Sequence, residues 1–149
     1  MKKLFIALMF SLATTASFSQ ISELAKPLKQ TKISTFGVVS ISCDRFENAS
    51  IFQFNDSKYQ QIKVPVFFTL TDSEFEEVYA ALNNRFSKEE FTADEGFIMT
   101  TKDNVQILFK FTKMMGTKSV KFGVEKNGIT SLGSFLTQKQ VNKLFDKSI

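Results

Sequence analysis

The sequence predicts an α+β fold in which a single antiparallel sheet of about six to seven strands carries two amphipathic helices packed on one face. Two observations predict this class. Apolar and polar residues alternate with period two in several stretches after residue 32, which is the pattern of half-buried strands. Two further stretches, beginning at Leu70 and Leu136, carry the start signals of helices. The expected order is three strands, a helix, three or four strands and a second helix.

The N-terminal segment is typical of a bacterial secretory signal peptide. Lys2 and Lys3 precede an apolar run, and Ser17 and Ser19 supply the small residues that precede a signal-peptidase cut. The run is shorter than the roughly 20 apolar residues that a transmembrane helix needs. The alternative is a buried N-terminal helix. A cut after Ser19 would place Gln20 first, and in this the segment resembles those of many secreted proteins of the Bacteroidota.

We therefore expect an exported protein, periplasmic or secreted, with no transmembrane segment in its mature chain. Pro27 interrupts the segment that follows the cut, which is predicted to be a tether or a short helix. The expected regions are a signal peptide (1–19), the tether or short helix (20–31) and a single α+β domain (32–149), with half-units of about 32–87 and 96–149.

Strands of the first half are predicted from alternation before the first helix. Within 39–43, every second residue is apolar, and Cys43 is interpreted as a small apolar residue on that face. Between residues 62 and 70 the apolar residues again share one face, whereas Phe67 points away from it. Pro65 lacks a backbone N–H, so this strand is expected to be an edge strand or to be bulged there.

Both helices are predicted to begin with the same capping motif. Thr71 and Glu74 stand three residues apart, as do Thr137 and Gln140. In a capping box the threonine side chain accepts from the N–H three residues later, and the Glu or Gln side chain accepts from the cap N–H. Apolar residues after each cap recur on one helical face, which is expected to pack on the sheet.

Strands of the second half are predicted at 105–111 and 120–124, where apolar residues again alternate with polar ones. Asn127-Gly128 follows, and both residue types tolerate positive φ, so a two-residue type I′ hairpin is expected. Gly116 marks a further turn.

The two caps lie 66 positions apart, and the strand at 39–43 shifted by that offset falls on the strand at 105–111. Internal duplication is one explanation, and independent use of the same good helix start is the other. A wide sheet in strands-then-helix order also resembles the saddle-shaped fold of TATA-binding protein and its relatives. This resemblance is topological, since no sequence motif carries it, and it implies nothing about function.

The amino-acid composition excludes most common types of catalytic site. The chain has no His and a single Cys, so it has no imidazole base, no multi-thiolate metal site and no intramolecular disulfide. Its six glycines form no phosphate-binding loop. Carboxylates such as Glu76 and Glu77 are interpreted as a solvated helix face. We therefore expect no enzyme and no cofactor.

Candidate binding residues are apolar or basic. Phe67, Met114 and Met115 are predicted to form a contact patch for a partner if they are exposed together; the alternative is that they pack on neighbouring loops. Lys110, Lys113, Lys118 and Lys121 form a possible basic face that could meet anionic lipid or polysaccharide, or could be an ordinary solvated face.

The net charge of the chain gives little information about its partner. Without Lys2 and Lys3 the chain has 17 basic and 15 acidic residues, which is not the dense positive charge of a nucleic-acid-binding protein. The sequence predicts an exported, non-enzymatic interaction protein of the bacterial envelope or periplasm, for instance an inhibitor or accessory protein, which binds another protein or an envelope component. The alternative is a carrier that holds a small apolar ligand between the sheet and the helices.

Overall fold

The computed structural model describes residues 25–59, 61–89 and 95–147. The predicted signal peptide, 1–19, lies outside the described residues. The first strand begins at Lys29, so it occupies the end of the range in which a tether or short helix is expected.

Within these ranges, eight strands and two helices follow one another, and the order β-β-β-β-α occurs twice. The first unit consists of β1 (Lys29–Thr35), β2 (Val38–Arg45), β3 (Ala49–Asn55), β4 (Pro65–Thr71) and α1 (Asp72–Ser87). The second unit consists of β5 (Gly96–Thr100), β6 (Gln106–Met114), β7 (Thr117–Lys126), β8 (Ile129–Thr137) and α2 (Gln138–Leu144).

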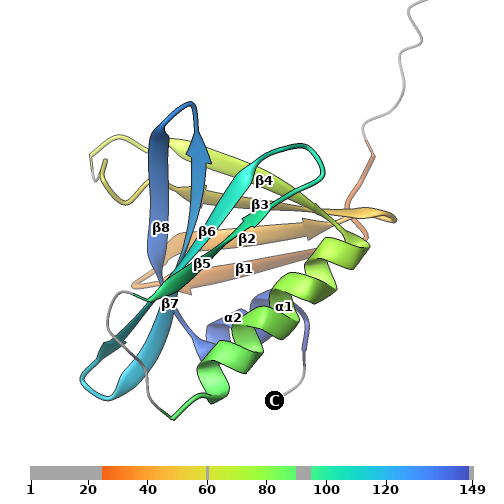
Figure 1. Ribbon diagram of the computed structural model, residues 1–149. Coiled ribbons are helices and arrows are strands. Elements are labelled where there is room, and N and C mark those ends of the chain that lie inside the picture. The colour runs from red at the N-terminus through yellow and green to blue at the C-terminus, as the bar shows by residue number, and fades with distance from the viewer. Residues whose placement is uncertain (1–24, 60, 90–94, 148–149) are drawn as a thin grey trace, which may run out of the picture.

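The prediction of a single sheet is wrong, because the strands form two separate four-stranded antiparallel sheets. Each sheet keeps its strands in chain order, β1-β2-β3-β4 and β5-β6-β7-β8, and the strands of the two sheets cross each other (Figure 1). Alternation shows that each strand has one buried face, but a second sheet can cover that face as well as helices can. The resemblance to the saddle-shaped fold depends on one wide sheet and fails with it.

The two units match strand by strand. Ile33 pairs with Ile41 in the first sheet, and the residues 66 positions later, Met99 and Ile107, pair in the second. The helix caps, Thr71 and Thr137, have the same offset. β3 corresponds to β7 at an offset of 70, because the hairpin before β7 is four residues longer and the connection after it is shorter. The repeat is therefore one of architecture as well as of helix starts.

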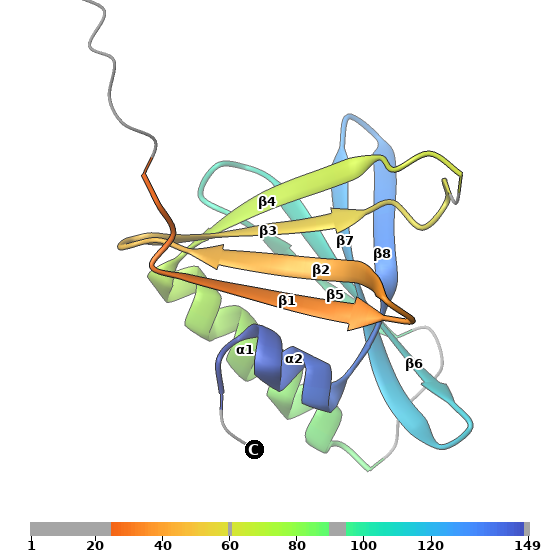
Figure 2. The same cartoon turned by 180° about the vertical axis from the view of Figure 1, so that it is seen from behind.

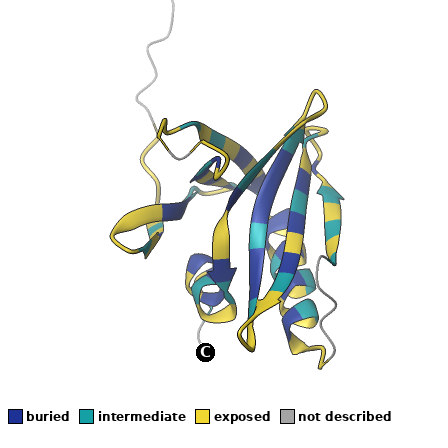
Figure 3. Cartoon of the chain, turned by 90° about the vertical axis from the view of Figure 1, so that its left-hand side faces the viewer, coloured by how far each residue is buried: buried dark blue, intermediate teal, exposed yellow. Residues whose placement is uncertain are grey.

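A single hydrophobic core lies between the sheets and the helices (Figure 3, dark blue). Phenylalanine rings pack within and between the sheets: Phe52 stacks on Phe68 in the first sheet with ring centroids 4.8 Å apart, and Phe68 meets Phe122 of the second sheet at 6.5 Å. Gly133 on β8 lets the sheets approach, because a Cβ there would lie 3.1 Å from the ring of Phe54. The alternating apolar faces that the sequence shows are the inner faces of two sheets.

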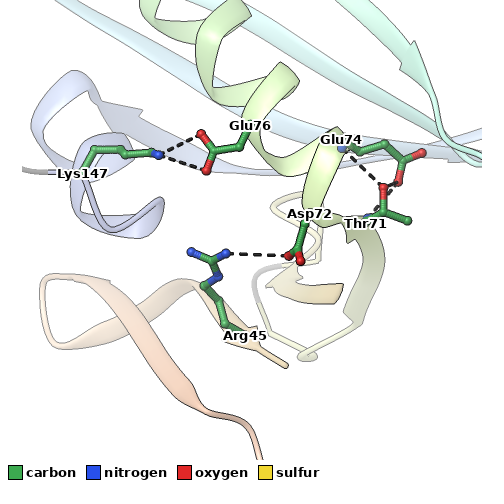
Figure 4. Close-up of polar contacts among 6 residues, drawn as sticks. All are labelled: Arg45, Thr71, Asp72, Glu74, Glu76 and Lys147. Carbon is green, nitrogen blue, oxygen red and sulfur yellow. Dashed lines mark hydrogen bonds and ion pairs between the residues drawn. The ribbon is translucent and has the colours of Figure 1, made fainter. Parts of the chain in front are cut away.

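Both capping boxes are confirmed, and each forms the predicted reciprocal hydrogen bonds. The Thr71 N–H donates to Glu74 Oε2 at 2.8 Å, and the Glu74 N–H donates to Thr71 Oγ1 at 3.4 Å. The Thr137 N–H donates to Gln140 Oε1 at 2.9 Å in the same way. Arg45 of β2 further fixes the start of α1, lying 3.8 Å from Asp72, while Glu76 on the same helix pairs with Lys147 (Figure 4).

Contacts between the units tie each helix to the opposite sheet. α2, from the second unit, packs against β1, and Lys29 of β1 pairs with Asp146 just beyond α2. The C-terminal end of α1 is bound by the second unit, because Lys118 Nζ donates to the carbonyl oxygens of Phe86 and Lys88. Between the helices, Tyr79 Oη donates to Asn142 Oδ1 at 3.3 Å.

Candidate peptide-binding groove

A cleft runs between α1 and β5, which lie along one another (Figure 1). Its volume is about 540 Å³, and a smaller cleft of about 260 Å³ continues it toward the C-terminal end of α1. Residues Phe97–Lys102 form one wall, and the other wall comes from α1, chiefly Glu77, Val78 and Ala81. The helix approaches β3 and β4 more closely than it approaches β5, which leaves the space open.

β5 is an edge strand whose outer backbone faces this groove. Among the described residues it pairs only with β6, through bonds such as Phe111 N–H to Glu95 O at 2.7 Å and Thr101 N–H to Val105 O at 2.9 Å. In an antiparallel pair, alternate residues turn their N–H and C=O groups toward the partner. Residues 95, 97, 99 and 101 therefore face β6, and the backbone groups of Gly96, Ile98 and Thr100 face away from it.

Polar contacts fix the width of the groove at both ends. At one end the Lys102 N–H donates to Glu74 Oε1 at 2.8 Å, so the cap of α1 also holds the end of β5. At the other end Arg85 of α1 forms an ion pair with Glu95, the residue before β5. The edge between these ends carries no charged residue, and Ile98 is 58% exposed.

Glu74 is a buried carboxylate with several hydrogen bonds. Burial by itself raises the pKa of this carboxyl, but the backbone N–H groups of Thr71 and Lys102 donate to it, and together with the Thr71 hydroxyl they bring the pKa below its ordinary value. The side chain is therefore ionised at neutral pH and stabilises the junction between the two units.

The predicted contact patch is divided by the structure. Phe67, on the outer face of β4, is 54% exposed and borders a cleft of about 510 Å³ that Ile129 and the Asn127 turn also line. Met114 and Met115 lie at the turn between β6 and β7, at the opposite end of β7. A ten-residue strand is about 33 Å long, so Phe67 and the methionines do not form one surface.

The predicted basic face is divided as well. Lys110 and Lys121 are cross-strand neighbours on the outer face of the second sheet, and Lys121 Nζ lies 4.2 Å from the ring centre of Phe135. Lys113 and Lys118 are also cross-strand neighbours, but Lys118 turns toward the end of α1. The four lysines thus belong to one hairpin but not to one face.

Reactive side chains do not converge among the described residues. In residues 25–59, 61–89 and 95–147, no three His, Cys, Asp or Glu side chains come together as metal ligands. Cys43 is buried on β2, and burial raises the pKa of its thiol to about 12. Glu76 pairs with Lys147, away from the groove that Glu77 lines.

No helix in the part of the chain that the structure describes is long and apolar enough to cross a membrane. Comparison of the chain with family models, with curated proteins and with solved structures finds no match.

The groove is a feature that sequence reasoning missed. The sequence predicts no strand between the first helix and residue 105, although Phe97 and Met99 alternate with more exposed residues at Ile98 and Thr100. That short alternation is the signal that could have located β5. Nothing in the sequence shows that this strand lies beside α1.

Proposed function

We propose that the protein is an exported, non-enzymatic interaction protein that binds an extended segment of another protein along the free edge of β5. The outward backbone groups of this edge, beside the groove to α1, are the observation that carries the proposal. The signal-peptide pattern of residues 1–19 supports export.

Strand addition suits the chemistry of this groove. An extended segment placed beside β5 would exchange backbone hydrogen bonds with Gly96, Ile98 and Thr100. Its side chains would alternate, so that every second one faces the apolar wall formed by Val78 and Ala81 of α1. Backbone bonds would supply affinity, and the side chains that meet α1 would supply selectivity.

A proline on the edge tests the proposal. Ile98→Pro removes an N–H that β5 does not use in its ladder with β6, so the fold should be retained while strand addition is blocked. Thr69→Pro on β4 is the matched control. The Asp56 N–H donates to Val64 O at 3.0 Å, and with this register the Thr69 N–H also points to an outer edge, that of β4.

The probe is a displayed library of random twelve-residue peptides, selected on the chain that starts at Gln20. We expect selected peptides to lose at least tenfold in affinity for the Ile98→Pro variant and to bind the Thr69→Pro variant within twofold of the parent. Failure to select any binder, or selected peptides that bind the Ile98→Pro variant equally well, would contradict the proposal.

The alternative of a small-ligand carrier gains no support from the described interior. The space between the sheets and the helices, where such a ligand would lie, contains packed rings: Phe75 and Phe145 from the two helices lie 4.7 Å apart, and Phe145 also meets Phe52 at 5.5 Å. Binding in the groove requires no such internal space.

A further inference from the structure

Two hairpin tips present large apolar side chains in an unfavourable backbone conformation. Phe36 and Met115 each occupy the first position of a two-residue turn, with φ of 53° and 49°, and each is followed by a glycine with positive φ. Their relative exposures are 101% and 100%. Neither side chain is covered by the rest of the described molecule.

The third turn of this kind shows the residue that the position favours. Asn127-Gly128, between β7 and β8, has φ of 54° and 74° and fits the preference of type I′ turns for Asn-Gly. A bulky apolar residue at positive φ is a conformational outlier, and such strain often accompanies function. Phe36 and Met115 combine that strain with full exposure to water, so folding does not explain either residue.

Lysines are the charged residues nearest in sequence to the apolar tips. Lys32 precedes Phe36 on β1, and Lys113 and Lys118 flank the turn at Met115, whereas the acidic residues of the two hairpins, Asp44 and Glu125, lie at the far ends of β2 and β7. Met114 and Val38, beside the tips, are 55% and 57% exposed. Glu95, at the neighbouring end of β5, is already paired with Arg85 of α1.

The two tips point to the same side of the molecule. The turns after β1 and β6 both project to the left in Figure 1 and both to the right in the reverse view of Figure 2. They belong to separate hairpins, so a single protein partner would need a matching pocket for each of them. A deformable apolar medium with a negatively charged surface fits this arrangement better.

We propose that this side of the protein docks on an anionic lipid bilayer. Phe36 and Met115 insert at the level of the headgroups, and the hairpin lysines, Lys32 and Lys113 among them, contact the lipid phosphates. The inference is independent of the β5 groove, which lies between other elements and could bind a protein segment whether or not the tips reach a membrane.

Vesicle co-sedimentation tests the proposal. The chain that starts at Gln20 is mixed with vesicles of phosphatidylethanolamine and phosphatidylglycerol in a three-to-one ratio, and in parallel with phosphatidylcholine vesicles. We expect binding to the anionic vesicles at least tenfold stronger than to the neutral ones, and weaker as salt is raised because surface potentials are screened.

Variants separate insertion from simple charge attraction. Phe36→Asn with Met115→Asn keeps the turn conformation, and we expect it to weaken anionic-vesicle binding at least tenfold. Lys32→Gln with Lys113→Gln should weaken binding and flatten the salt dependence. Ile129→Ser, beside the Asn127 turn at the other end of β7, is the control and should bind within twofold of the parent.

Three outcomes would overturn the proposal. The first is that the parent protein does not sediment with anionic vesicles, which would favour a protein partner for the two tips. The second is equal binding to neutral vesicles. The third is a folded Phe36→Asn, Met115→Asn variant that binds as well as the parent, which would show that the tips do not insert. Circular dichroism of each variant establishes that it is folded.

Discussion

At the scale of single residues, Glu74 links the sequence motif to the assembly of the molecule. One carboxylate oxygen accepts from the N–H of Thr71 and completes the cap of α1, and the other accepts from the N–H of Lys102 in the second unit. A capping box is therefore also a contact between the two units. The first role is readable from the spacing of Thr71 and Glu74, and the second is not, because Lys102 is distant in the sequence.

Glu74 should make stability depend on pH. Its pKa is lower in the folded protein than in the unfolded chain, so its contribution is present above the unfolded pKa of about 4.3 and is lost as the pH falls through the folded pKa. We expect Glu74→Gln to remove this dependence while keeping the cap, because Gln140 caps α2 in the same way. Chemical denaturation from pH 7 to pH 3 measures the effect.

Glu74→Ala provides the contrast. It leaves the N–H groups of Thr71 and Lys102 without their acceptor, so a loss of about 1–2 kcal/mol in the free energy of unfolding at pH 7 is expected. If wild type and Glu74→Gln lose stability in parallel on acidification, the carboxylate is not the group responsible.

At the scale of elements, the type I′ turns show that the local sequence determines some turn conformations and that strand pairing determines others. Asn127-Gly128 is predicted from the sequence and is confirmed by its φ values. The turn at Phe36-Gly37 is not predicted, because phenylalanine gives no signal for positive φ. Pairing of β1 with β2 imposes that conformation, which means that the strands override the local preference of the residue.

Replacing the strained tips should stabilise the protein. Phe36→Asn and Met115→Asn each place a residue that tolerates positive φ where a bulky one now stands, and each side chain is exposed, so no packing is lost. We expect each change to raise the free energy of unfolding by about 0.5–1 kcal/mol. Urea denaturation measures it, with Asn127→Met as the reverse control, expected to destabilise by a similar amount. Destabilisation by both Asn variants would show that the tips are not strained.

Strand prediction succeeds where alternation is long and fails where the chain bends. Cys43 and Ile41 are buried as expected, but Val39 is 42% exposed, because the register of β1 and β2 shifts at Ile33 and Ser34. The alternation predicts that Ile62 shares a face with Phe68, yet Ile62 precedes β4 and is 70% exposed. Bulges and strand ends depend on the partner strand, which alternation does not identify.

At the scale of the whole molecule, the sequence repeat does not determine how many sheets the strands form. The offset of 66 positions between the caps correctly indicates two similar units. It does not show whether the sheets of those units join edge to edge or pack face to face. The face-to-face arrangement depends on details such as Gly133, which leaves room for Phe54 of the other sheet.

Each helix contacts both units, which implies that neither unit folds alone. Because α1 is held by Lys118 and Lys102 of the second unit, and α2 packs on β1 of the first, each isolated unit would expose an uncovered apolar sheet face. We expect fragments 20–89 and 90–149 to be unfolded separately and to form a folded complex when mixed. Far-ultraviolet circular dichroism with size-exclusion chromatography measures this. A folded isolated fragment would contradict the interlocked arrangement.

The free outer edge of β5, on which the proposed function rests, is tested most directly by residue-resolved amide hydrogen exchange of the unliganded protein. The amides of Phe97 and Met99 face β6 and should exchange slowly, whereas those of Ile98 and Thr100 face the groove and should exchange at least a hundredfold faster. Slow exchange at Ile98 and Thr100, equal to that of their neighbours, would show that the edge is already occupied and would contradict strand addition at this site.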